Sequence, residues 1–306
     1  MWLLIGLRFI QGLSGAAGLV ISRAIARDLY QGNELTKFFS LLMAVNGVFP
    51  ILSPIFGGMV LKFTDWKGIF IVLGIIGTIL FLATLLYFKE TLTIDYSQEN
   101  DPKVIFTALK SLISDKIFMS YALVQGLVTG AMFCYISGSS FVLQNMFSLS
   151  AQGFSLVFAI NGIGIVFMSQ AAGRLSYRLG EKLLLQIGLS IAVFGSIALF
   201  ISLFLPKHLL AVTIPLFFIV SMVGMVNPPA FSLAMQNQKK WAGSASAILG
   251  LGMNLIGGLL SPLVGIRGNQ TYVPMALLIL ICNIGAFLIF YLYLNRQIPY
   301  NSSNGI

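Results

Sequence analysis

Residues 45–58 read VNGVFPILSPIFGG, within a run that carries no charge from Phe38 to Val60. Two prolines, three glycines and an asparagine are unusual in so apolar a segment. Residues 253–265, MNLIGGLLSPLVG, repeat the pattern further along the chain. The matches, all at one offset of 208 residues, are Asn46, Leu52, Ser53, Pro54 and Gly57 with Asn254, Leu260, Ser261, Pro262 and Gly265. This recurrence indicates an internal repeat.

The composition requires lipid as the solvent of this chain. Of 306 residues, 58% are hydrophobic and 9% are charged, and the mean hydropathy is +0.93. A soluble domain carries about 25% charged residues, so the polar groups here cannot cover a soluble surface. We interpret the net charge of +9 as a sign of membrane topology and expect no nucleic-acid partner. Cys134 and Cys282 lie in apolar runs and His208 in a short loop, so we expect no disulfide framework, metal or cofactor.

Apolar runs long enough to span a bilayer recur along the whole chain. Nine such runs lie near residues 2–26, 38–61, 69–88, 118–141, 153–172, 183–204, 209–232, 243–265 and 273–294. They must be helices, because lipid offers no partner to a free backbone amide. A β-barrel would show short alternating segments instead. The sequence therefore predicts an all-α polytopic membrane protein.

The distribution of cations between alternate loops predicts the orientation. Thirteen of the 18 Lys and Arg residues fall in one set of loops, at positions 23, 27, 37, 89, 103, 110, 116, 174, 178, 182, 239, 240 and 296. The alternate loops hold four, at positions 62, 67, 207 and 267. The positive-inside rule places the first set in the cytoplasm. We expect the plasma membrane of a bacterium, with the amino end of this sequence outside and the carboxyl end inside.

The long polar segment 89–117, which we predict to be a cytoplasmic loop, divides the chain. It separates a first part, 1–88, from a six-helix half, 118–296, which is followed by a cytoplasmic tail, 297–306. Two interpretations of the loop are open: a short helix on the membrane face or a plain tether. The short helix is suggested by four apolar residues at helical spacing, Ile105, Leu109, Leu112 and Ile113.

The offset of 208 residues also predicts where the repeats lie. Subtracting it from the last three spans gives 1–24, 35–57 and 65–86, which are the first three spans. The same subtraction carries 118–204 to positions before Met1. Parallel six-helix repeats joined by a cytoplasmic loop are the build of major facilitator transporters. By this arithmetic we expect three helices of the first half to be absent, and nine helices to remain as three plus six. In that case we expect this chain alone not to drive proton-coupled efflux.

Several motifs resemble one transporter family. RFIQGLSGAAGLVISRAIARDLY at 8–30, NGVFPILSPIFGG at 46–58, DWKGIF at 65–70 and KETL at 89–92 resemble the major facilitator superfamily, and most closely its Bcr/CflA drug-resistance branch. The resemblance is specific over residues 8–92 and rests on hydropathy and scattered motifs elsewhere. It implies drug:proton antiport, with protons, the lipid bilayer and a small amphipathic organic substrate as partners.

The opening stretch is predicted to be a pliable, close-packed helix. Asn46, Pro50, Pro54 and Gly58 lie four apart, on one stripe of a helix. Each proline removes a backbone hydrogen bond and bends the axis, while glycines such as Gly57 allow a neighbour to approach. The matching stripe in the second half is Gly250, Asn254, Gly258 and Pro262. The resemblance implies that these stripes seal and hinge the two halves; the alternative is that proline and glycine are common in membrane helices.

Arg8 is the charge that lies inside a predicted span, where an ionisable group is costly and a functional candidate. The resemblance links the arginine of an RxxQG motif to proton coupling, and Arg8, Gln11 and Gly12 match it. The alternative is that Arg8 snorkels to the outer interface. All nine acidic residues lie in loops or at helix ends, so the spans offer no buried carboxylate for the proton.

Two further groups of candidates lie in the second half. GRLSYRLGEK at 173–182 resembles the cytoplasmic gate motif through Gly173, Arg178 and Gly180, although Tyr177 stands where an aspartate is usual; an ordinary basic loop is the alternative. Five polar or aromatic residues at membrane depth are candidates to line a central cavity: Tyr121, Gln125, Phe133, Asn161 and Asn227. The alternative is that they form interhelical hydrogen bonds.

The function that we predict is export of multiple drugs by proton antiport. Mostly apolar walls with a few amides suit amphipathic molecules rather than sugars. An enzyme is not expected, because no nucleophile–base pair or metal set is visible. Two alternatives remain: a carrier of a small metabolite, and a truncated remnant that transports nothing.

Overall fold

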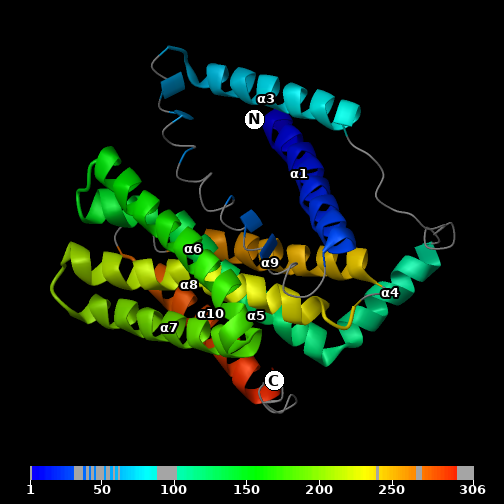
Figure 1. Ribbon diagram of the computed structural model, residues 1–306. Coiled ribbons are helices and arrows are strands. Elements are labelled where there is room, and N and C mark those ends of the chain that lie inside the picture. The colour runs from blue at the N-terminus through cyan, green and yellow to red at the C-terminus, as the bar shows by residue number, and fades with distance from the viewer. Residues whose placement is uncertain are drawn as a thin grey trace.

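The computed structural model describes residues 2–30, 37–38, 41–42, 45, 52, 56–57, 59–60, 63–87, 102–238, 241–266 and 271–294. Every regular element among these residues is helical (Figure 1). The α-helices are α1 (Trp2–Leu29), α3 (Trp66–Tyr87), α4 (Pro102–Ser114), α5 (Lys116–Ser140), α6 (Ala151–Leu179), α7 (Glu181–Ile201), α8 (Leu209–Met235), α9 (Ala242–Val264) and α10 (Val273–Ile289). Short π-helical or 3₁₀ segments, η1 (Phe141–Met146), η2 (Ser202–Phe204) and η3 (Phe290–Leu294), extend α5, α7 and α10.

The helices confirm the predicted all-α membrane fold. Seven helical stretches in the described ranges are long and apolar enough to cross a membrane: 66–87, 116–146, 152–179, 181–204, 209–235, 243–264 and 273–294. The predicted spans near 2–26 and 69–88 correspond to α1 and α3. The largest difference in bounds is at α6, which continues to Leu179, seven residues past the expected end. That extension carries polar residues beyond the apolar run, so hydropathy alone did not include it.

The six helices α5 to α10 pack into one bundle, with α1 and α3 on one side of it and α4 at one end (Figure 1). Helix α8 is the central member: it packs against α5, α6 and α7, and most of its residues are buried. Helix α5 also packs against α9 and α10. The helices after residue 118 supply most of the core, to which Ala26 of α1 and Leu112 of α4 also contribute.

Small residues bring these helices close together. On α5, Gly126 and Gly130 face Ile256 of α9, and Gly138 faces Met275 of α10. A Cβ placed on Gly126 would lie 2.7 Å from Cδ1 of Ile256, and one on Gly138 would lie 2.6 Å from Sδ of Met275. A stripe of small residues is the usual device for close helix packing in lipid, where there is no hydrophobic drive between helices.

Segment 102–114 of the long loop is a helix, α4, rather than a plain tether. Its Ala108 and Leu112 are buried against the bundle, whereas Phe106 and Ile113 are 68% and 60% exposed. The expected apolar stripe is thus divided, because Leu112 faces the protein and Ile113 faces away. The carboxylate of Asp115 then caps α5 by accepting hydrogen bonds from the backbone N–H groups of Ile117 and Phe118.

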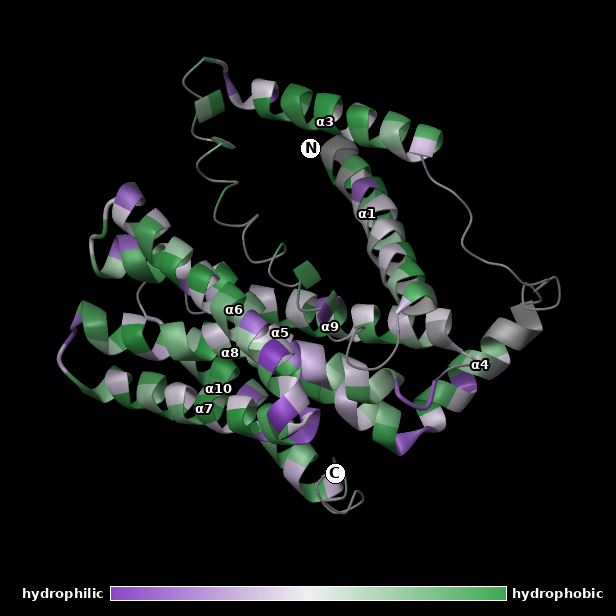
Figure 2. Cartoon of the chain, in the orientation of Figure 1, coloured by the Kyte–Doolittle hydropathy of each residue, from purple (hydrophilic) through white to green (hydrophobic). Residues whose placement is uncertain are grey.

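Helices α1 and α3 expose apolar side chains along most of their length (Figure 2). Some of their hydroxyls bond within the helix: Thr78 and Thr84 donate to the carbonyl oxygens of Gly74 and Leu80. Such internal bonds let a polar side chain face lipid. Shifted by 208 residues, α1 covers 210–237 against 209–235 for α8, and α3 covers 274–295 against 273–294 for α10 with η3. The helix bounds therefore follow the repeat to within two residues.

Candidate functional site

Three polar side chains meet between α5 and α8. Gln125 Nε2 donates to the backbone carbonyl oxygen of Asn227 at 3.2 Å, and Asn227 Nδ2 donates to Thr129 Oγ1 at 3.2 Å. Gln125, Thr129 and Asn227 are all at least 97% buried. Both bonds join different helices. Gln125 and Asn227 thus form interhelical hydrogen bonds, which was the alternative to lining a cavity. We call these three residues the amide cluster.

The amide cluster keeps unused hydrogen-bonding capacity. Gln125 Oε1 and Asn227 Oδ1 are buried and accept no hydrogen bond from any described residue, and the same holds for the hydroxyl of Tyr121. Tyr121, Gln125 and Thr129 recur every four residues and therefore lie on one stripe of α5. Since buried oxygens normally have a partner, this stripe can still accept hydrogen bonds from a polar group that reaches it.

Asn161 lies apart from the amide cluster, between α5 and α6. Its Nδ2 donates to the hydroxyl of Tyr135 at 2.8 Å, and the Tyr135 ring stacks on Phe158 at 5.7 Å between centroids. Phe133 is half-buried and packs against Gly257 of α9, where a Cβ would collide with the ring. Asn161, Phe133 and the Gln125–Asn227 pair thus occupy three different helix contacts instead of one shared wall.

The predicted hinge residues of the second half share the outward face of α9. Asn254, Gly258 and Pro262 are exposed, and Asn254 Nδ2 donates to the carbonyl oxygen of Gly250 one turn earlier, at 2.9 Å. Pro262 stands in the last turn of α9, which ends at Val264. Of the first-half stripe, Asn46, Pro50, Pro54 and Gly58 lie outside the described residues; only the helical Gly57 is described.

The residues of the coupling motif lie in the first half of α1. Gln11 and Gly12 are exposed, and the side chain of Arg8 lies outside the described set. Gln11 lines a cavity of about 480 Å³ between α1 and α3, whose other lining residues are Leu7, Trp66, Lys67, Phe70, Leu73 and Gly74. Lys67 Nζ lies 5.9 Å from the centroid of the Trp66 ring, a cation–π distance.

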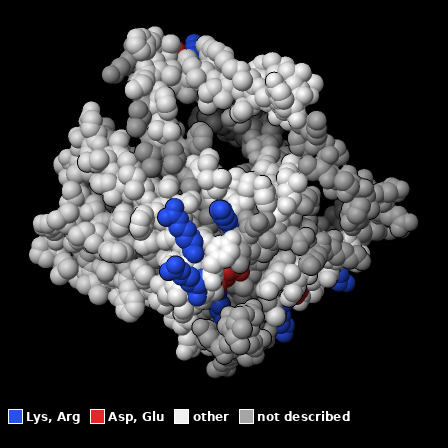
Figure 3. Space-filling model, in the orientation of Figure 1, with Lys and Arg blue, Asp and Glu red and all other residues white. Residues whose placement is uncertain are grey.

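The predicted gate motif forms the junction between α6 and α7. Gly180 adopts φ 77°, and its N–H donates to the carbonyl oxygen of Ser176, ending α6. Gly173 is buried, while Arg178 is exposed beyond it. In Figure 3, Lys and Arg side chains lie at the centre and lower right of the drawn face, beside a small acidic area, and the left side of that face shows no charge among the described residues. This arrangement matches a basic helix junction at the membrane surface.

Sequence reasoning missed the partners of the predicted residues. Thr129 and Tyr135 hold Asn227 and Asn161, and a further buried bond joins Asn283 Nδ2 to Ser196 Oγ at 2.8 Å between α10 and α7. The sequence feature that could have indicated Thr129 as part of this cluster was its position four residues after Gln125, on the same side of the helix. Across the described ranges, no three His, Cys, Asp or Glu side chains come together in a way that could hold a metal ion.

Comparison with known proteins identifies the family. The family model of the Major Facilitator Superfamily matches residues 1–262. An uncharacterized MFS-type transporter, YdgK, of Bacillus subtilis is 40% identical over 304 residues, which are 98% of this chain and 75% of that protein. A bicyclomycin resistance protein homolog of Haemophilus influenzae is 26% identical over 95% of this chain and 73% of its own length. A chloramphenicol resistance protein of Pseudomonas aeruginosa is 26% identical over 65% of this chain and 46% of its own length. The chain belongs to the Major Facilitator Superfamily and is a membrane-embedded protein of the transporter type.

Proposed function

We propose that this chain acts in the export of uncharged or amphipathic organic molecules from a bacterial cell, in exchange for protons. The observation that carries the proposal is the chemistry inside the α5–α10 bundle. Every buried polar side chain described there is an uncharged amide or hydroxyl. Apolar walls with a few neutral hydrogen-bonding groups suit such molecules better than ions or sugars.

The amide cluster is the proposed contact for the substrate. The free acceptors Gln125 Oε1 and Asn227 Oδ1 lie between α5 and α8, about two turns inside the nearer end of each helix. In facilitator transporters the substrate site lies near the bilayer midplane at the repeat interface. A substrate N–H or O–H donating to these oxygens would replace a hydrogen bond to water, which lowers the cost of entering the membrane.

The gate and hinge residues fit an alternating-access carrier. Gly180 makes a sharp reversal between α6 and α7, and the face of α9 that carries Asn254 and Pro262 is available to a facing segment. We propose that the first-half stripe, Asn46, Pro50, Pro54, Gly57 and Gly58, opposes a second-half helix when the halves rock. The resemblance to the Bcr/CflA antiporter motif supports this assignment.

Proton exchange is the second part of the proposal. No Asp or Glu lies within the interior of the described spans, so the coupling group is not a carboxylate of α3 or of α5–α10. Arg8, Gln11 and Gly12 carry the match to the coupling motif of the Bcr/CflA branch. We assign Arg8 an electrostatic role, because a guanidinium does not release its proton at a workable pH.

A carrier of a small polar metabolite is the second candidate. The observation that favours it is the number of buried oxygens that still accept hydrogen bonds, which include Ser221 Oγ, Ser246 Oγ and Asn283 Oδ1 besides those of the amide cluster. A metabolite would use more of these groups than an amphipathic drug. Competition between unlabelled amino acids and a labelled drug separates the two candidates.

The test measures accumulation of bicyclomycin and of chloramphenicol in energised bacteria that lack their own drug pumps. Two forms are compared: the 306-residue chain, and the chain preceded by the amino-terminal helices of the Bacillus subtilis relative, of which it covers 75%. Lower accumulation that an uncoupler restores supports proton-driven export. Unchanged accumulation of both compounds with both forms, at matched membrane expression, overturns it.

A further inference from the structure

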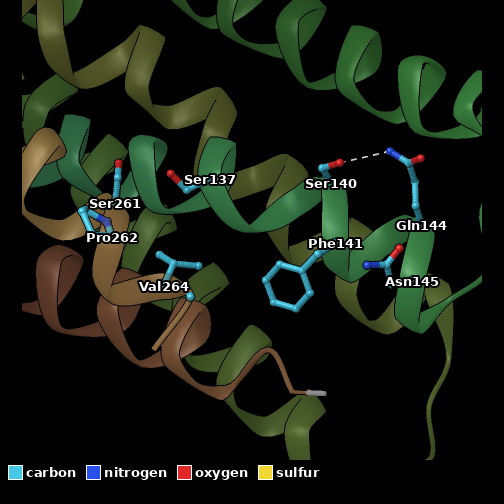
Figure 4. A pocket seen from close by; sticks show the side chains of 9 residues that line it. Ser137, Ser140, Phe141, Gln144, Asn145, Ser261, Pro262 and Val264 are labelled. Carbon is cyan, nitrogen blue, oxygen red and sulfur yellow. Dashed lines mark hydrogen bonds between the residues drawn. The ribbon is translucent and has the colours of Figure 1, made fainter. Parts of the chain in front are cut away.

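A second polar site lies at the carboxyl-terminal ends of α5 and α9, apart from the amide cluster. It is a cavity of about 420 Å³ between α5, η1 and α9 (Figure 4). The lining residues are Ser137, Ser140, Phe141, Gln144, Asn145, Ser261, Pro262, Val264 and Gly265. Ser137 stands twelve residues after Gln125 on α5, which is about 18 Å along the axis. The two sites therefore cannot be parts of one small contact.

The local backbone explains why polar groups gather here. At Phe141 the α-helix passes into the π-helical segment η1, and wider turns of this kind often lie at functional sites. Ser137, Ser140 and Gln144 line the cavity from this part of the chain, with Ser137 drawn nearest to Ser261 and Pro262 (Figure 4). On α9, Ser261 lines the cavity, and its Oγ donates to the carbonyl oxygen of Gly257 at 2.8 Å. Both helices thus present polar groups to the cavity.

Most of these polar groups still have hydrogen bonds to make. Gln144 Nε2 donates to Ser140 Oγ at 3.1 Å, which leaves the carbonyl oxygen of Gln144 as an acceptor. Asn145 and Ser137 are exposed, and their side chains form no hydrogen bond with another described side chain. Phe141, Pro262 and Val264 supply an apolar wall. No lining residue is charged.

We infer that this cavity is a binding site for uncharged amphipathic molecules that carry amide or hydroxyl groups. Its volume lies in the range of small-molecule sites, roughly 300 to 1,000 Å³. The hydroxyls and amides orient the polar groups of the ligand, and the ring of Phe141 packs on its apolar part. The absence of charge from the lining disfavours ionic ligands, whose desolvation would not be compensated.

The role of this site rests on the proposed export function. The topology proposed from the cations places the ends of α5 and α9 at the outer surface, so the site is where an exported molecule pauses before release. Binding itself does not depend on transport, and the experiment measures binding alone.

The experiment measures the rate at which an impermeant maleimide labels Asn145→Cys in the full chain, reconstituted in vesicles, with and without chloramphenicol as the probe. Native Cys134 and Cys282 are 0% and 2% exposed and give little background. We expect a saturating probe to slow labelling at least threefold. Gln152→Cys, an exposed amide position at the start of α6 outside the lining, is the matched control and keeps its rate.

A second variant tests the chemistry of the lining. Gln144→Leu in the Asn145→Cys background removes one hydrogen-bonding group and should raise the half-protecting probe concentration by about three- to tenfold, the usual effect of one hydrogen bond. Gln152→Leu should leave it unchanged. Equal labelling with and without the probe, or equal slowing at Gln152→Cys, overturns the site. Protection combined with unchanged accumulation of both drugs by both forms of the chain keeps the site and rejects the export function.

Discussion

The side chains of Asp115 and Gln238 join two points 123 residues apart in the sequence. Gln238 Nε2 donates to Asp115 Oδ2 at 2.9 Å, while Asp115 Oδ1 accepts from the backbone N–H groups that begin α5. One carboxylate thus caps α5 and holds the connection between α8 and α9. Both elements lie at the end of the bundle that the cation distribution predicts to be cytoplasmic.

The first prediction concerns this carboxylate. Asp115→Ala removes the cap and the link to Gln238, and we expect it to lower the free energy of unfolding by about 1–2 kcal/mol, the range of a lost helix cap. Gln238→Ala removes the link alone and should cost less than half as much. Thermal unfolding of the purified chain in detergent measures both. A larger effect for Gln238→Ala would show that the cap is not the main contribution.

The second prediction separates function from stability at two buried asparagines. Asn227→Leu and Asn283→Leu each break one interhelical hydrogen bond, so both should cost about 1–2 kcal/mol of stability. If the amide cluster binds substrate, only Asn227→Leu should also raise the KM for transport, by at least threefold. Asn283 bonds to Ser196 between α10 and α7 and is the matched control. An equal change of KM in both variants would remove the amide cluster from the substrate path.

The third prediction concerns Gly180, which holds φ 77° at the reversal between α6 and α7. Gly180→Ala forces a Cβ into the left-handed region and should lower stability by about 1–2 kcal/mol. Gly243→Ala, in the first turn of α9 with open space around it, should be neutral or slightly stabilising. Chemical denaturation in detergent compares the two. Equal stabilities would show that the junction tolerates an ordinary backbone.

The fourth prediction concerns orientation. Ser97→Cys, in the segment predicted to be cytoplasmic, should resist an impermeant thiol reagent in intact cells and react in inverted vesicles. His208→Cys, in the exposed connection between η2 and α8, should behave in the opposite way. Labelling of Ser97→Cys from outside would reverse the topology and place the cavity of Figure 4 in the cytoplasm.

The helices of this protein were predictable from the sequence because lipid leaves the backbone no other solution. The spans that became α5, α8 and α10 needed only their hydropathy to be found. The extension of α6 to Leu179 was not predictable in the same way, since the added residues lie beyond the apolar run. Membrane hydropathy locates where a helix crosses the bilayer but not where it ends.

The contacts of the candidate site were less predictable. That Gln125 and Asn227 are buried followed from their depth, but that they meet each other depends on how α5 and α8 are rotated about their axes. In a helix whose faces are all apolar, the sequence carries little information about that rotation. Tyr121, Gln125 and Thr129 mark one stripe, whereas nothing in the sequence paired Asn161 with Tyr135. The π-helical turn at Phe141 likewise had no sequence signal that we recognised.

The glycines of α5 have a mechanical consequence. Gly126 packs on Ile256 of α9 and Gly138 on Met275 of α10, so a side chain added at either position would first displace the flexible end of the residue opposite it. Sliding one of these helices past another would force the same side chains to repack. We therefore expect α5, α9 and α10 to move as one unit in a rocking carrier.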